Sequence, residues 1–184
     1  MTPIEKTDEN LVYQPFFDAV GRDDWSSAQE FLNEHPEAQS VRHPVLGRTA
    51  LHIAARRGYE QMVQKLVQVM KEEDQEILDN KGQTALVLAL GTGKTSIAKF
   101  MADKNRKILG IPHRAVLPVC SAFGYGNINL ARYLYFITPE EYLCRHGAML
   151  LFTSMQAEQY GIIIFFLFQI TNIVFSRCIY TYTH

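Results

Sequence analysis

The stretch that decides the fold is GRTALHIAARRGYEQMVQKLV, residues 47–67, because its pattern recurs along the chain. A shift of 35 residues places it over GQTALVLALGTGKTSIAKFMA, residues 82–102, and matches its threonine, leucine, alanine and glycine positions. The same shift backwards from the first segment aligns PFFDAVGRDDWSSAQEFL, residues 15–32, and a shift of 33 forwards from the second segment aligns PVCSAFGYGNINLARYLY, residues 118–135. Self-similarity at a fixed period of this length is typical of a repeat protein.

Each repeat predicts two short antiparallel helices joined by a turn. The threonine of TAL is a helix N-cap, and the Ala or Pro after it suits the first helical position. Gly58 and Gly93 follow the first helix, where a left-handed residue ends it and reverses the chain. An apolar stripe such as Met62 to Val67 then marks the second helix.

A period near 33 residues, two short helices and the residues TALHIA resemble the ankyrin repeat. The resemblance implies an all-α solenoid of helix-turn-helix repeats with finger loops, and an irregular apolar helix at the C-terminus. We expect repeats at about 10–44, 45–79, 80–110 and 113–138, within an array that spans 10–136. Outside it we expect a disordered N-terminus, a partial diverged repeat and a hydrophobic tail, at residues 1–9, 139–160 and 161–184.

Three segments are similar to one ankyrin group, the plant proteins related to accelerated cell death and salt-tolerance factors. They are GRDDWSSAQEFLNEHPEA (21–38), MADKNRKILGI (101–111) and ARYLYFITPEEYL (131–143). The resemblance implies a protein-interaction scaffold in stress and defence signalling. The membrane-spanning PGG domain of that family does not follow residue 160, so we interpret the sequence as truncated before it.

The segment GTGKTS, residues 91–96, offers an alternative, because it resembles a phosphate-binding loop. Such a loop needs a glycine five positions before Gly93, where this chain has Leu88. No aspartate follows Asp103 to help hold magnesium. We therefore predict a non-catalytic protein without a cofactor, and a nucleotide-binding enzyme is the less favoured hypothesis.

The charge balance and the cysteines exclude other classes of function. Lys and Arg number 18 against 19 Asp and Glu, so the bulk charge offers no argument for nucleic acid as a partner. The three cysteines are widely spaced, which argues against a zinc site and a disulfide framework. The polar N-terminus lacks the features of a secretion signal, so we predict a cytoplasmic repeat array. We also expect this array to be a monomer.

The tail supports two interpretations. Residues 159–176 are uncharged and reach the lower limit of a membrane-spanning helix, which would make the protein a membrane-tethered adaptor. Gln169, Thr171 and Asn172 lie near the middle of this span, where polar groups disfavour insertion. In the other interpretation the tail is the product of a truncated or mis-spliced gene.

Partner binding is predicted at the finger loops and at the ends of the first helices, which face a common groove in such arrays. These positions are rich in Arg and Lys, so we predict that they bind an acidic or phosphorylated protein segment. In the competing interpretation the arginines are merely solvated. The candidate residues are Arg22, Arg48, Arg56, Arg57, Lys81, Gln83, Thr92, His113, Arg114 and Tyr125.

Two further side chains have predicted roles. His52 is expected to make a structural hydrogen bond to a neighbouring turn, because no second titratable group accompanies it in the sequence. Trp25 is expected to fill the edge of the core.

Overall fold

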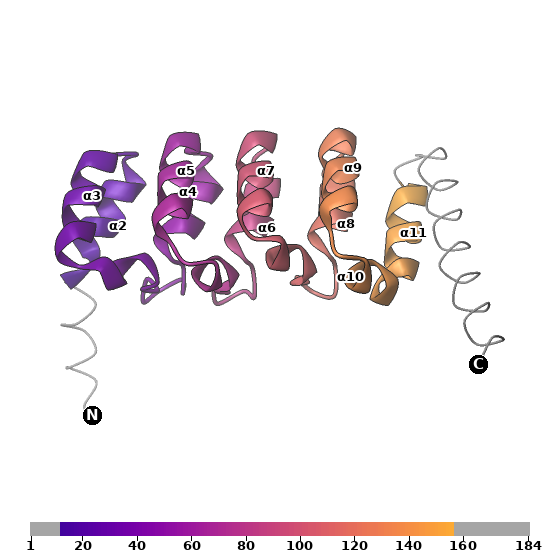
Figure 1. Cartoon of the computed structure of the whole chain (residues 1–184), viewed down its shortest axis with the longest axis horizontal. Helices are drawn as coiled ribbons and strands as arrows, with labels where there is room; N and C mark the ends of the chain where they lie inside the picture. The colour runs from indigo at the N-terminus through magenta and orange to yellow at the C-terminus, as the bar shows by residue number, and fades with distance from the viewer. Residues whose placement is uncertain (1–11, 157–184) are drawn as a thin grey trace, which may run out of the picture.

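The protein is a row of helix pairs (Figure 1), and its computed structural model describes residues 12–156. The first helices of successive pairs are α2 (Gln14–Gly21), α4 (Ala50–Arg57), α6 (Ala85–Leu90) and α8 (Pro118–Gly124). The second helices are α3 (Trp25–Glu34), α5 (Glu60–Val69), α7 (Thr95–Lys104) and α9 (Ile128–Ile137). Between residues 12 and 156 there is no β-strand, which confirms the predicted all-α solenoid.

Short helical segments and loops connect the pairs and lie along one edge of the row (Figure 1). Three of these segments are 3₁₀ turns: η1 (Pro36–Gln39), η2 (Glu73–Glu76) and η3 (Arg106–Gly110). After the fourth pair this place is taken by an α-helix, α10 (Glu140–Arg145). A further helix, α11 (Gly147–Gln156), packs on α8 and so continues the row of first helices.

Threonines precede the first helices of the two middle repeats, whereas α2 and α8 begin after Tyr13 and Leu117 without a side-chain cap. The Thr84 hydroxyl accepts a hydrogen bond from the Val87 amide at 3.4 Å, as predicted for the threonine of TAL. Thr49 differs, because its hydroxyl lies 2.8 Å from Nδ1 of His52.

Alanine lets the first helices approach one another closely. Ala19, Ala54, Ala89 and Ala122 occupy equivalent repeat positions, and each is at most 2% exposed. The first helices accordingly pack in the order α2, α4, α6, α8 and α11. Each repeat contacts its neighbours, so the array has one continuous core.

The turn after each first helix requires a left-handed residue. Gly58, Gly93 and Gly126 have φ values of 73°, 76° and 74°. In the first pair Asp23 adopts φ 62° at the equivalent position. The chain reverses there to start the second helix, whose stripe in α5 buries Met62, Val63, Leu66 and Val67.

Some predictions concern residues outside 12–156. They are the predicted disorder of residues 1–9, the predicted hydrophobic tail at 161–184 and the predicted membrane span at 159–176. Within the described range, no helix is both long enough and apolar enough to cross a membrane.

Candidate protein-binding groove

Three finger loops and the row of first helices form a grooved surface, which we call the groove. The finger loops are residues 43–48, 78–83 and 111–116. The surface is hollowed in three places, with volumes of about 300, 350 and 440 Å³. We call these the first, second and third hollows, because they follow one another from α2 towards α8.

The hollows bring together nine of the ten predicted partner-binding residues. The first hollow, between α2 and α4, is lined by Arg22 and Arg57. The second hollow is lined by Arg56, Gln83, Thr92 and Tyr125, and the third by Lys81, Gln83, His113, Arg114 and Tyr125.

Arg48 is the exception: the sequence predicts that it faces the groove, and the structure contradicts this prediction. Its side chain is buried, with 7% of the residue exposed, and its Nε donates to Oδ2 of Asp79 at 3.2 Å. Asp79 belongs to the next finger loop. Arg48 therefore joins two repeats instead of facing a partner.

One acidic residue also faces the groove, at the end formed by α2. The exposed side chain of Asp18 lines the first hollow, together with Arg22 and Arg57. Asp18 lies in the middle of α2, before the helix end at which partner binding is predicted. The second and third hollows have no acidic residue among their lining side chains.

Apolar groove residues were missed for a similar reason. Phe17 and Ile53 line the first hollow, and Val87 lines the other two. Ile53 and Leu88 hold equivalent repeat positions, two residues after the buried leucine of each first helix, and both line a hollow, so the repeat register could have identified this position. At the tip of the first finger loop, Val45 is 73% exposed and Leu46 is 45% exposed.

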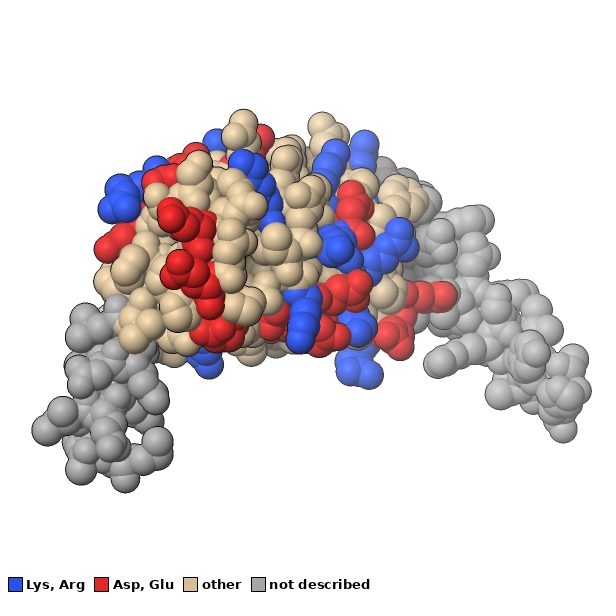
Figure 2. Space-filling model, turned by 60° about the vertical axis from the view of Figure 1, so that its left-hand side comes forward, with Lys and Arg blue, Asp and Glu red and all other residues tan. Residues whose placement is uncertain are grey.

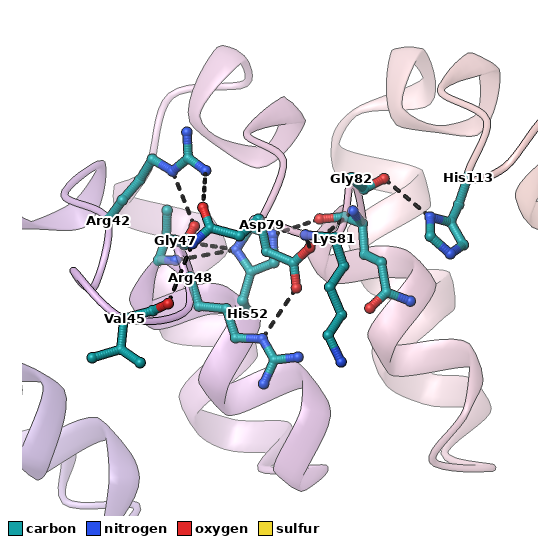
Figure 3. A network of polar contacts seen from close by, with 12 residues as sticks. Arg42, Val45, Gly47, Arg48, His52, Asp79, Lys81, Gly82 and His113 are labelled. Atoms are coloured by element: carbon teal, nitrogen blue, oxygen red, sulfur yellow. Dashed lines mark hydrogen bonds and ion pairs between the residues drawn. The ribbon is translucent and has the colours of Figure 1, made fainter.

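A polar network fixes the first two finger loops against each other (Figure 3). Arg42 donates through Nε to the Gly47 carbonyl at 3.0 Å and through Nη2 to Oδ1 of Asn80 at 3.1 Å. The Asn80 amide nitrogen Nδ2 in turn donates to the Val45 carbonyl at 3.3 Å. These bonds, with the Arg48–Asp79 ion pair, hold the second finger loop in position.

Asp79 organises its own finger loop from the inside. Its Oδ1 accepts from the backbone amides of Lys81 at 2.8 Å and Gln83 at 3.0 Å. Burial alone would raise the pKa of Asp79, but the two amides and the Arg48 guanidinium outweigh it and lower the pKa below the ordinary value. The carboxylate therefore stays ionised and keeps the Lys81 side chain at the loop surface.

His52 makes the structural hydrogen bond that the sequence predicts. Its Nε2 donates to the Gln83 carbonyl at 3.0 Å, since a carbonyl oxygen only accepts. Nδ1 accepts from the backbone amide of Thr49 at 3.2 Å and lies 2.8 Å from the Thr49 hydroxyl. Burial lowers the pKa of His52, in keeping with this neutral form.

Basic side chains also cap the ends of neighbouring helices. Lys94, the lysine of GTGKTS, donates through Nζ to the Gly58 carbonyl at 2.8 Å. Its charge therefore lies at the C-terminal end of α4, where a cation is favoured. A helix, α6, precedes the glycines of this segment, whereas a phosphate-binding loop follows a strand. Arg57 similarly donates through Nη1 to the Gly21 carbonyl.

The charges of the groove belong to a molecule of mixed surface charge. Figure 2 shows one face, on which acidic side chains run down the N-terminal half and along the lower edge, with Lys and Arg spread among them. The predominance of cations in the three hollows is thus a local property. It does not follow from the net charge of −1.

Comparisons with known proteins agree with this architecture. The family model described as "Ankyrin repeats (3 copies)" matches residues 16–111, which is just over half of the chain. A chain in the crystal structure of the yeast ribosomal protein Rps3 in complex with its chaperone Yar1 is similar in fold. The TM-score is 0.57 at 21% identity, over 66% of this chain and 89% of that chain. No curated protein matches the sequence.

The family match spans the first three helix pairs, and the repeat geometry continues through α8 and α9 with the same left-handed turn. Ankyrin repeats are typically non-catalytic modules that bind other proteins. This chain belongs to the ankyrin-repeat family.

Proposed function

We propose that the protein is a non-catalytic interaction scaffold whose groove binds a segment of another protein. The observation that carries the proposal is that cations line all three hollows, which follow one another along the row of first helices. Five of the lining residues are Arg or Lys: Arg22, Arg56, Arg57, Lys81 and Arg114. A single acid, Asp18, lies among them at one end.

The chemistry of the groove favours an acidic segment that also has apolar side chains. Arg pairs bidentately with carboxylate and phosphate, which supplies specificity. Tyr125, 59% exposed, lies between the second and third hollows, where an aromatic anchor can cover apolar atoms of a ligand. Val45 and Leu46 offer apolar contacts at the opposite end.

Charge reversal tests this function in the full chain. Arg56→Glu combined with Lys81→Glu alters two exposed side chains that have no hydrogen-bond partner among the described residues, so the fold should be retained. Arg57 is unsuitable because it also contacts the Gly21 carbonyl. Arg132→Glu, on the exposed surface of α9, is the matched control.

We expect affinity purification with quantitative mass spectrometry to show partners that the wild type and the Arg132→Glu control retain and the groove variant loses. Circular dichroism should be the same for all three proteins. An identical set of partners for the groove variant and the wild type would contradict the proposal.

The narrower placement of this scaffold in plant stress and defence signalling is supported by the resemblance of residues 21–38, 101–111 and 131–143 to that family. We also propose that the array acts as a cytoplasmic monomer. Transcripts in which the reading frame continues past residue 160 into several apolar spans would support the narrower family. A transcript that ends as the printed sequence does would instead favour a protein without that membrane domain.

A further inference from the structure

The third hollow differs from the other two because cations from two successive finger loops line it. Lys81 comes from the second finger loop and Arg114 from the third. His113 and Tyr125 add further polar groups, and no acidic side chain lines the hollow. Its volume of about 440 Å³ is the largest of the three.

Three donors of this hollow make no hydrogen bond within the part of the chain that the structure describes. The Lys81 ammonium, the Arg114 guanidinium and the Tyr125 hydroxyl have no hydrogen-bond partner among residues 12–156. By contrast, Arg42, Arg48, Arg57 and Lys94 are all bonded to carbonyl or side-chain oxygens. These four cations therefore serve the fold, whereas Lys81 and Arg114, like Arg56 in the second hollow, are free to bind a ligand.

The backbone of the third finger loop is unfavourable for the residues that it contains. His113 and Val116 pair as a β-bridge, with amide-to-carbonyl distances of 3.0 and 2.9 Å, around a two-residue turn. The two turn residues, Arg114 and Ala115, have φ values of 51° and 64°. Both positions of such a turn favour Asn or Gly, and other residues there are destabilising.

An arginine at this position thus reduces stability while it presents a guanidinium at the rim of the hollow. A destabilising residue that faces a ligand-sized hollow is a recognised indication of a binding role. A phosphate brings nearly two negative charges and three acceptor oxygens to Lys81 and Arg114, whereas a carboxylate brings one charge and two oxygens.

We propose that the third hollow is a phosphoryl-binding site, which holds the phosphate of a phosphorylated serine or threonine in a protein segment. This inference rests on the proposed function, since it assigns a ligand to one part of the groove. The Lys81 ammonium and the Arg114 guanidinium pair with the phosphate oxygens.

The test is an NMR titration of the ¹⁵N-labelled full chain with the peptide acetyl-Ala-Ala-phosphoSer-Ala-Ala-amide. Matched peptides carry serine or glutamate at the centre, and inorganic phosphate is titrated separately. We expect saturable shifts at the amides of Lys81, Arg114 and Tyr125. The phosphopeptide should bind about tenfold more tightly than the serine peptide and more tightly than the glutamate peptide or free phosphate.

Arg114→Gly separates binding from folding. Glycine suits the left-handed turn, so the thermal midpoint should stay unchanged or rise, while affinity for the phosphopeptide should fall by about tenfold. Lys81→Gln should weaken binding as well, and Arg132→Gln, the exposed control on α9, should not.

Three results would overturn the inference: equal affinity for the glutamate peptide, equal affinity for free phosphate, or unchanged phosphopeptide binding by Arg114→Gly. If one of these occurs while the groove variant Arg56→Glu with Lys81→Glu still loses partners, the interaction groove stands and the phosphoryl site falls. If that variant retains every partner, the proposed function itself falls.

Discussion

At the scale of single residues, Gln75 is the polar side chain that the fold accommodates least well. It is 1% exposed, and neither its Oε1 nor its Nε2 has a hydrogen-bond partner among the described residues. Equivalent places in the other 3₁₀ turns hold the buried apolar residues Ala38 and Ile108. An unpaired buried amide is destabilising, because it gives up its hydrogen bonds to water.

Replacement of Gln75 by leucine should therefore stabilise the protein. We expect Gln75→Leu to raise the free energy of unfolding by about 1 kcal/mol, since the volumes are similar and the unpaired groups are removed. Urea denaturation measures the change. Gln64→Leu, at an exposed position of α5, is the control and should have little effect. A loss of stability in Gln75→Leu would show that the amide has a partner.

His52 makes the stability of the array dependent on pH. Burial lowers its pKa in the folded protein below the ordinary value of 6.5, so the unfolded chain binds a proton more readily. Its contribution to stability is complete above pH 6.5 and decreases as the pH falls below that value. We expect the wild type to lose stability as the pH falls from 7 to 5.5, because the unfolded chain binds a proton at this residue and the folded protein does not.

The comparison with His52→Gln isolates this contribution. The variant lacks the titrating ring, so its stability should change less over the same pH range. Urea denaturation at several pH values measures both proteins. Parallel pH profiles for the wild type and the variant would contradict the assignment. Asp79 should not contribute in this range, since its pKa lies below an ordinary value that is already acidic.

At the scale of elements, the helix pairs share one turn geometry but not one turn residue. Asp23 has a left-handed backbone at the place where the next three pairs have glycine. A side chain at positive φ is destabilising relative to glycine. The turn within the first helix pair should therefore be less stable than the turns within the next three pairs.

Asp23→Gly should stabilise the turn between α2 and α3 by about 0.5–1 kcal/mol. The reverse change, Gly93→Ala, should destabilise the turn between α6 and α7 by a similar amount. A Cβ at Gly93 would meet no atom within 4 Å, so backbone strain alone would be measured. Urea denaturation of both variants checks the prediction. A loss of stability in Asp23→Gly would indicate that the aspartate side chain contributes a contact of its own.

At the scale of the whole molecule, the stack is stabilised most in its centre. In α3, Ala28 is the single fully buried residue, whereas α5 buries four residues and α7 buries Ile97, Ala98, Met101 and Ala102. Stability in such arrays depends on the interfaces between neighbouring repeats. Among residues 12–156 the end pair α2–α3 has one neighbouring pair, and α3 buries fewer residues than α5 or α7.

Hydrogen exchange should therefore reveal an order of opening. We expect amides of α4 to α7 to exchange about tenfold or more slowly than those of α2 and α3. Mass spectrometry of peptic fragments measures the difference, with residues of the finger loops as the rapidly exchanging reference. Equal protection of all helix pairs would show instead that the stack opens as one cooperative unit.

The repeat register predicted most of the architecture, because the equivalent positions of each repeat have the same local role. Leu51, Ala54 and Gly58 could be assigned to core and turn from their recurrence alone. Arg48 could not, since its repeat equivalent, Gln83, lies at the groove surface while Arg48 is buried. The difference arises from Asp79, a partner in the next finger loop that no local pattern identifies.

The same network affects how the groove deforms. Four side chains, Arg42, Arg48, His52 and Asn80, bridge the first and second finger loops, whereas His113 bridges the second and third through one bond of 3.2 Å to the Gly82 carbonyl. The contact between the first and second finger loops should therefore resist deformation more strongly than the contact between the second and third. A ligand would bind a rigid surface at the first two finger loops, whereas the third finger loop could shift to fit it.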